Sequence, residues 1–185
     1  MPYHQVLLQP SGCGLLIIDI QEKLFNVVSS RDQLLKNVSV LIRGFQTLNI
    51  PAFITEQYPK GLGPTIPNIR NQCKNAEVFE KLSFSCCTVE KLLQSFRNRK
   101  IKQIVLCGIE THICVWQTAM DLKALNFSVT VVSDAVSSRS QINRHTALER
   151  MRQHDIEVST VETVLFELLE KAGTEAFKTI SALVK

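Results

Sequence analysis

The sequence predicts an α/β protein with a three-layer architecture, in which helices cover both faces of a doubly wound sheet of six mostly parallel strands. Short apolar runs alternate along the chain with segments whose apolar residues recur at helical spacing, as in βαβ units. The 185 residues show no internal repeat and no dividing linker, so we expect one domain over 1–185. A hydrophobic fraction of 45% with 21% charged residues excludes collagen-like, low-complexity and disordered classes.

Each element follows from a local pattern. Apolar or β-branched runs predict strands at 14–19, 51–55, 78–81, 103–108, 128–132 and 156–159. Helical spacing of apolar residues predicts helices at 32–48, 88–99, 111–125, 143–153, 161–171 and 174–184. Five glycines and prolines in 57–67 predict a loop. Because βαβ crossovers are right-handed, a doubly wound sheet is the expected topology.

Charge and cysteine content limit the classes of partner. The 21 basic and 17 acidic residues are spread along the chain, so we expect no nucleic-acid partner. No apolar run approaches the roughly 18 residues that a membrane helix needs, and 1–10 does not resemble a signal peptide. The six cysteines include no CxxC pair, which predicts reduced thiols, no structural zinc and a cytoplasmic protein.

Candidate reactive residues follow the ends of the predicted strands, where ligands bind in open α/β sheets. Cys114 lies near the start of a predicted helix, where backbone N–H groups lower a thiol pKa, although it could also be a small buried apolar residue. Asp19 either caps a helix or works in the crevice, and Lys81 alone is most simply a solvated surface charge. Asp134 is expected to be structural and to bind N–H groups of the loop around 137–138.

Two neighbouring residues complete this set. Gln21 lies two positions after Asp19 and would share its side if the strand continued. His112 is a poor base for Cys114, because helical positions i and i+2 point about 200° apart unless the turn is irregular. No glycine-rich phosphate loop lies between a predicted strand and a helix, so no dinucleotide cofactor is expected.

Several of these stretches together resemble a known family. The segments 16–21 (LIIDIQ) and 107–115 (CGIETHICV), with the segment around Lys81, resemble the isochorismatase-like cysteine hydrolases, which include nicotinamidases and N-carbamoylsarcosine amidohydrolase. The segments 55–64 and 134–139 resemble the branch called isochorismatase domain-containing proteins. The resemblance runs from about residue 13 to the last predicted strand, and its motifs are specific for the family but not for a substrate.

The resemblance implies a strand order and a catalytic set. The order 3-2-1-4-5-6 would place the first and fourth strands side by side. Cys114 matches the family's nucleophile, Asp19 its general base and Lys81 the cation that joins them. A cis peptide bond is implied between Ile109 and Glu110, which would aim the Glu110 N–H beside the Cys114 N–H as an oxyanion hole.

Two departures narrow the chemistry that the family implies. The metal-binding Asp-x-His motif of nicotinamidases is absent from 55–58, so we expect no metal and no cofactor. Isochorismatases proper cleave a vinyl ether without needing the cysteine, so Cys114 favours hydrolysis of a small amide or carbamoyl compound through a thioester. The substrate pocket is expected to include four residues: Gln21, Phe25, Tyr58 and His112.

Two alternatives remain open, namely vinyl-ether hydrolysis and a non-catalytic binding protein that keeps the fold. The last two predicted helices carry apolar stripes that could pack on the sheet of the same chain or on another subunit: Val164, Leu165 and Leu168, and Phe177, Ile180 and Leu183. Because members of the family are usually oligomers, we expect a homodimer or a larger assembly.

Overall fold

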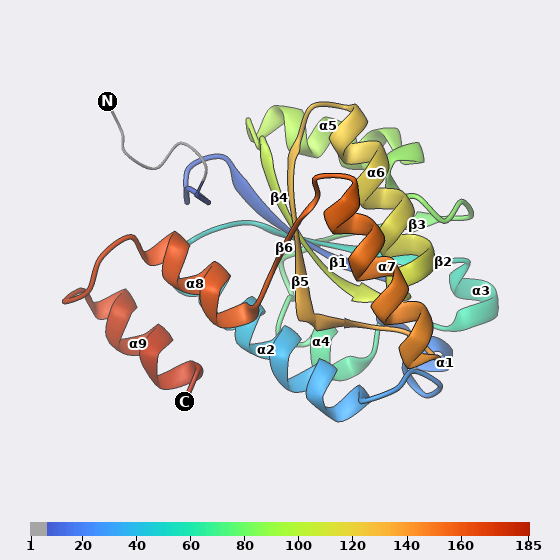
Figure 1. Ribbon diagram of the computed structural model, residues 1–185, viewed down its shortest axis with the longest axis horizontal. Coiled ribbons are helices and arrows are strands. Elements are labelled where there is room, and N and C mark those ends of the chain that lie inside the picture. Colours follow the sequence, from blue (N-terminus) through green and yellow to red (C-terminus); the bar gives the residue numbers. More distant parts are fainter. Residues whose placement is uncertain (1–6) are drawn as a thin grey trace.

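A six-stranded parallel sheet forms the centre of the computed structural model, which describes residues 7–185 (Figure 1). Its order is β3-β2-β1-β4-β5-β6, and every neighbouring pair is parallel. The strands are β1 (Cys13–Ile18), β2 (Ala52–Gln57), β3 (Glu77–Lys81), β4 (Gln103–Ile109), β5 (Ser128–Ser137) and β6 (Glu157–Ser159). The predicted fold class and strand order are therefore confirmed.

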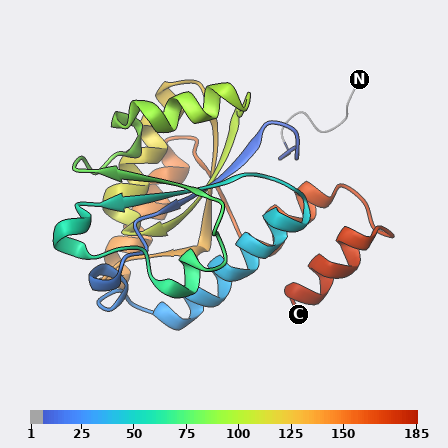
Figure 2. The same ribbon diagram turned by 180° about the vertical axis from the view of Figure 1, so that it is seen from behind.

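Helices cover both faces of the sheet, as Figures 1 and 2 show from opposite sides. One face carries α2 (Arg31–Thr47), α8 (Val161–Leu169) and α9 (Glu175–Leu183). The other carries α5 (Glu90–Asn98), α6 (Trp116–Ala124) and α7 (Gln141–Gln153). The remaining helical segments are α1 (Glu22–Phe25), α3 (Pro59–Leu62), α4 (Pro67–Arg70), η1 (Cys86–Thr88) and η2 (Thr111–Val115).

The central strand β1 contributes to both cores. Successive side chains of a strand point to opposite faces, so Leu15 and Ile17 pack with the helices of the α2 face, whereas Leu16 and Ile18 pack with those of the α5 face. All four are fully buried, as expected for a parallel strand covered on both sides. At the end of β1, Ile18 lies beside Gly108 of β4, which brings the residues that follow these two strands together.

The structure corrects two expectations about the loops and strand ends. The predicted loop at 57–67 includes α3 and the start of α4, each with proline at its first position, where the missing N–H is not needed. Strand β5 extends past its predicted end at 132, because its pairing with β4 shifts register between Leu106 and Gly108 and resumes at Val136.

Asp134 therefore lies within β5 and not after it. Its Oδ1 accepts a hydrogen bond from the Val161 N–H at 2.9 Å. The prediction that Asp134 binds N–H groups near 137–138 is wrong, because the side chain satisfies the first N–H of α8 instead.

The apolar stripes of the terminal helices pack mainly within the chain. Val164, Leu165 and Leu168 are buried against α2 and the sheet, and Ile180 of α9 joins the same core. Phe177 and Leu183 are half-buried. Among residues 7–185, no helix has the length and apolar character needed to cross a membrane.

Candidate active site

A buried ion pair joins the ends of two strands that are not neighbours. Lys81, the last residue of β3, reaches past β2 so that its Nζ lies 2.6 Å from Oδ2 of Asp19, which follows β1. Both side chains are 0% exposed, which excludes the alternative that Lys81 is a solvated surface charge. Burial lowers the pKa of Lys81, but the surrounding groups, with the Asp19 carboxylate first among them, together hold that pKa above its ordinary value. Lys81 is thus an ammonium at neutral pH.

Two residues of the intervening strand β2 complete this network, and neither is among the predicted site residues. The Thr55 hydroxyl donates to Asp19 Oδ1 at 2.7 Å, so both carboxylate oxygens have a donor. Gln57 Oε1 accepts from Lys81 Nζ at 2.8 Å. Because Thr55 and Gln57 are two positions apart in a strand, they share one face of the sheet. The sequence carries a signal for them, because Thr55 and Gln57 are polar residues two positions apart that follow the apolar start of β2.

Cys114 lies in a π-helical turn and not in a regular α-helix. The turn η2 precedes α6, which begins at Trp116, whereas the sequence predicts one helix over 111–125. Such π-turns are frequent at functional sites. The residue is 4% exposed.

The electrostatic surroundings of Cys114 favour the protonated thiol. Burial, followed by the nearby Asp19 carboxylate, raises the pKa of Cys114, and the Lys81 ammonium offsets only part of this effect. The expectation that the helix start yields a resting thiolate is therefore wrong. A protonated thiol beside an ionised carboxylate can instead lose its proton as it attacks a substrate.

The backbone just before this turn contains a cis peptide bond at the position where the family resemblance implies one. The peptide bond between Ile109 and Glu110 is cis. Both residues are buried. Glu110 Oε1 accepts from the backbone N–H of Arg139 at 3.0 Å and from its Nε at 2.9 Å. The Glu110 side chain is thereby tied to the segment that follows β5.

His112 faces the start of α7. Its Nδ1 lies 3.1 Å from Ser138 Oγ, and its Nε2 lies 3.3 Å from Asn143 Nδ2. These contacts agree with the argument that His112 is not the base for Cys114. The ring is half-buried, so its edge can still border an approaching molecule.

The other predicted pocket residues differ in their accessibility. Gln21 is completely buried, and its amide is used within the protein, accepting from the Gln57 N–H and donating to the carbonyls of Gln57 and Gly63. The Gln21 amide therefore anchors Gln57 and Gly63, and these bonds leave it little capacity to bind a substrate. Phe25 is half-buried against the α2-side core, and Tyr58 is half-exposed at the start of α3.

A second thiol, also absent from the predicted set, lies beside the network. Cys86 at the start of η1 is completely buried, and its Sγ is 3.6 Å from Thr55 Oγ1. Burial and then the Asp19 carboxylate raise its pKa to about 12. Cys86 is therefore a protonated thiol with no exposed surface, so it is not placed to compete with Cys114 for a substrate.

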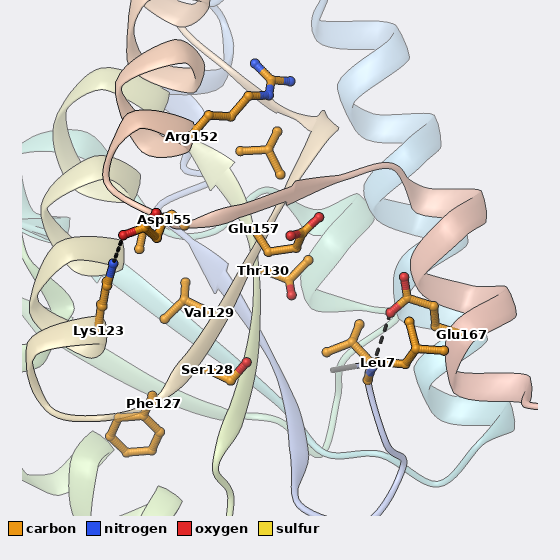
Figure 3. A pocket seen from close by; sticks show the side chains of 13 residues that line it. Leu7, Lys123, Phe127, Ser128, Val129, Thr130, Arg152, Asp155, Glu157 and Glu167 are labelled. Carbon is orange, nitrogen blue, oxygen red and sulfur yellow. Dashed lines mark hydrogen bonds and ion pairs between the residues drawn. The ribbon is translucent and has the colours of Figure 1, made fainter. Parts of the chain in front are cut away.

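One surface hollow lies away from these residues. It has a volume of about 690 Å³ and is lined by residues near the starts of β5 and β6, such as Ser128 and Glu157 (Figure 3). The ion pair between Lys123 and Asp155 borders it. Asp19, Lys81 and Cys114 lie at the opposite side of the sheet, at or just after the carboxyl-terminal ends of β1, β3 and β4. Among the residues that the structure describes, no cluster of three metal-ligating side chains occurs.

Comparisons with known proteins agree with this architecture. The isochorismatase domain model matches residues 13–163. Isochorismatase domain-containing protein 2 of Danio rerio is 40% identical over 179 residues, which cover 96% of this chain and 89% of that protein. A structure described as the MAR1 ribonuclease from Caenorhabditis elegans is 34% identical, with a TM-score of 0.91 over 97% of this chain and 92% of that one. The Escherichia coli YcaC gene product, described as an octameric hydrolase of unknown specificity, is 25% identical, with a TM-score of 0.90 over 99% of this chain and 92% of that one.

Proposed function

Because the chain belongs to the isochorismatase family and has its hydrolase fold, we propose that it is a cysteine hydrolase that cleaves a C–N bond of a small amide or carbamoyl compound. One observation carries this proposal. A buried, oriented carboxylate–ammonium pair, Asp19 and Lys81, lies near a protonated thiol, that of Cys114, in the turn after the neighbouring strand. This is the arrangement of a nucleophile with its base and an orienting group.

In the first half-reaction, Cys114 Sγ attacks the carbonyl carbon of the substrate while its proton moves to Asp19. The carbonyl oxygen becomes an oxyanion, and the N–H groups of Glu110 and Cys114 would bind it, as the family resemblance implies. When the C–N bond breaks, Asp19 returns the proton to the leaving nitrogen. Ammonia or an amine departs, and an acyl thioester remains on Cys114.

In the second half-reaction, water replaces the amine. Asp19 takes a proton from the water, the oxygen attacks the thioester carbon, and the thiol of Cys114 is protonated as it leaves. The products are a carboxylic or carbamic acid and the amine, and the protein returns to its starting state. Lys81 remains an ammonium throughout and holds the Asp19 carboxylate in place.

A panel of primary amides, ureas and carbamoyl compounds, read by ammonia release, tests the proposal. Activity should fall to background in Cys114→Ala and in Asp19→Asn, and mass spectrometry should find an acyl adduct on Cys114. Cys87→Ala is the matched control, because Cys87 is a half-buried thiol outside the network. Turnover that is equal in Cys114→Ala and in the native protein would refute the proposal.

The same variants separate the competing activities. Vinyl-ether hydrolysis would need Asp19 but would survive Cys114→Ala. Because the Caenorhabditis elegans structure is described as a ribonuclease, single-stranded RNA belongs in the panel. RNA cleavage that persists in Cys114→Ala and is lost in Asp19→Asn would replace the amide assignment. Binding of a partner without turnover of any substrate would favour a non-catalytic protein.

We also propose a homo-oligomer located in the cytoplasm. The octameric Escherichia coli relative supports an assembly, and the six cysteines, all free here, suit a reducing compartment. Light scattering that gives the mass of a single chain would contradict the assembly.

A further inference from the structure

We propose that Gln57 is a positioning residue that fixes the Lys81 ammonium, so that Lys81 orients Asp19 and makes no contact with substrate. The geometric part of this inference stands by itself, and its kinetic part rests on the proposed hydrolase activity. It assigns a role to a β2 residue that the catalytic set does not include.

The ammonium of Lys81 has no donor left for a substrate. A lysine carries three N–H donors. Four oxygen atoms surround Nζ, namely Asp19 Oδ2 at 2.6 Å, Gln57 Oε1 at 2.8 Å, and the carbonyls of Phe84 at 3.1 Å and Ser83 at 3.4 Å. The side chain is also 0% exposed. Its charge can therefore reach the reaction only through Asp19 and the local field.

The Gln57 amide is held in one orientation. Its Nε2 donates to the Leu82 carbonyl at 2.6 Å, so Oε1 is the end that faces Lys81. A reversed amide would place an NH₂ group against the ammonium and lose both hydrogen bonds. The orientation therefore follows from the network around it.

The backbone of Gln57 is fixed as firmly as its side chain. Its N–H donates to Gln21 Oε1 at 2.7 Å, and its carbonyl accepts from Gln21 Nε2 at 3.0 Å. Gln21 Nε2 also donates to the Gly63 carbonyl at 2.6 Å, which anchors the end of α3. Gln57 thus connects the segment after β1, the end of β3 and the 58–63 segment to one ammonium.

A neutral acceptor suits this position better than a charged one. A carboxylate at position 57 would give Lys81 two anionic partners and leave the buried site with an additional negative charge. That charge would disfavour ionisation of the nearby Cys114 thiol. The amide can hold Lys81 without this penalty.

Nitrogen-15 NMR of the lysine side chains tests the geometric part. The native protein should show one slowly exchanging ammonium signal, assigned by its loss in Lys81→Met. In Gln57→Met, which has a similar length but lacks the acceptor, the exchange should accelerate about tenfold or more, since a hydrogen bond to a charged group contributes about 1.5–3 kcal/mol. Gln103→Met is the matched control, because the Gln103 amide bonds to the backbone of residues 7 and 9 at the amino-terminal end of β4, away from Lys81.

Kinetics on the amide found in the substrate panel tests the functional part. In Gln57→Met, kcat should fall about tenfold with KM within about twofold, because the residue acts on Asp19 through Lys81. In Gln57→Glu, the midpoint pH for alkylation of Cys114 should rise. An unchanged Lys81 exchange rate in folded Gln57→Met, or an unmoved alkylation midpoint in Gln57→Glu, would overturn the inference.

The two proposals can fail separately. If the lysine signal responds as expected but no amide is hydrolysed, Gln57 positions Lys81 and the proposed function is wrong. If amide hydrolysis requires Cys114 but neither Gln57 variant changes exchange, kcat or the alkylation midpoint, the function stands and the role of Gln57 is refuted. If Gln57→Met does not fold, the alkylation midpoint of Gln57→Glu decides.

Discussion

Gly108 of β4 lies beside Ile18 of β1, and replacing it with alanine should push apart the two strands that lead to Asp19 and Cys114. Its φ is +120°, a conformation that side-chain-bearing residues rarely adopt. A Cβ atom there would lie 2.1 Å from the Ile18 carbonyl oxygen and 2.7 Å from the Ile18 nitrogen. Because both are backbone atoms of the central strand, they cannot move aside as a flexible side chain would.

The expected loss of stability has two parts. An unfavourable positive φ costs about 1–2 kcal/mol. Forcing a methyl group into a packed interior adds about 1–3 kcal/mol. Gly108→Ala should therefore lower the free energy of unfolding by about 2–5 kcal/mol. Gly173→Ala is the matched control, because Gly173 has a φ of +86° but no atom within 4 Å of the added Cβ, so only the first part applies.

Chemical denaturation, followed by circular dichroism and by fluorescence of the single tryptophan, Trp116, measures both variants. Gly108→Ala should also lose more activity than its stability predicts, because the displaced residues directly precede Asp19 and the turn that holds Cys114. Equal destabilisation by Gly108→Ala and Gly173→Ala would refute the explanation that the backbone contact requires glycine.

Three further predictions concern the buried network and the thiols. Thr55→Val, which removes a donor to Asp19, should reduce kcat about tenfold while Thr55→Ser retains most of it, and equal rates would contradict this role. Lys81→Met should lower the free energy of unfolding by about 3–5 kcal/mol, because it leaves the buried Asp19 carboxylate without its cation. Lys123→Met, which breaks the more exposed Lys123–Asp155 ion pair, should cost about 1 kcal/mol or less, and chemical denaturation compares the two variants. Burial raises the pKa of Cys86 from 9.0 to about 12, so its unfolded form ionises first. The stabilisation from keeping the Cys86 thiol protonated should be fully present below about pH 9 and should fall by about 1.4 kcal/mol per pH unit between about pH 9 and 12. A free energy of unfolding that does not change over this range, measured by denaturation at a series of fixed pH values, would exclude the effect.

Local patterns are sufficient for most of the sheet, because its strands are buried on both faces and appear as uninterrupted apolar runs. β1 was expected at 14–19 and occupies Cys13–Ile18. The end of β5 could not be predicted, since its last residues pair with β4 only after a register shift that depends on the neighbouring strand. The short helices α3 and α4 were hidden by the prolines that begin them.

The candidate site shows a similar division. Family motifs singled out Asp19, Lys81 and Cys114, and the structure brings Lys81 and Asp19 into contact although 62 positions separate them. Thr55 and Gln57 are ordinary polar residues in isolation, and only the adjacency of β1, β2 and β3 gives them partners. The protonation state of Cys114 was predicted wrongly, because burial and a neighbouring carboxylate outweigh the local effect of a helix start.

The enclosure of Asp19 and Lys81 has a consequence for how charge is distributed during turnover. Before reaction, the set formed by Asp19, Lys81 and Cys114 holds one anion, one cation and one neutral thiol. Moving the sulfur's proton onto the carboxyl group relocates the anion without creating a new one, so the sum over the three groups stays at zero. A low-dielectric interior strongly penalises an uncompensated ion. The buried site would oppose the loss of the Cys114 proton to solvent, because that would leave an uncompensated negative charge. It can accommodate transfer of the same proton from Cys114 to Asp19, because the net charge of the three groups does not change.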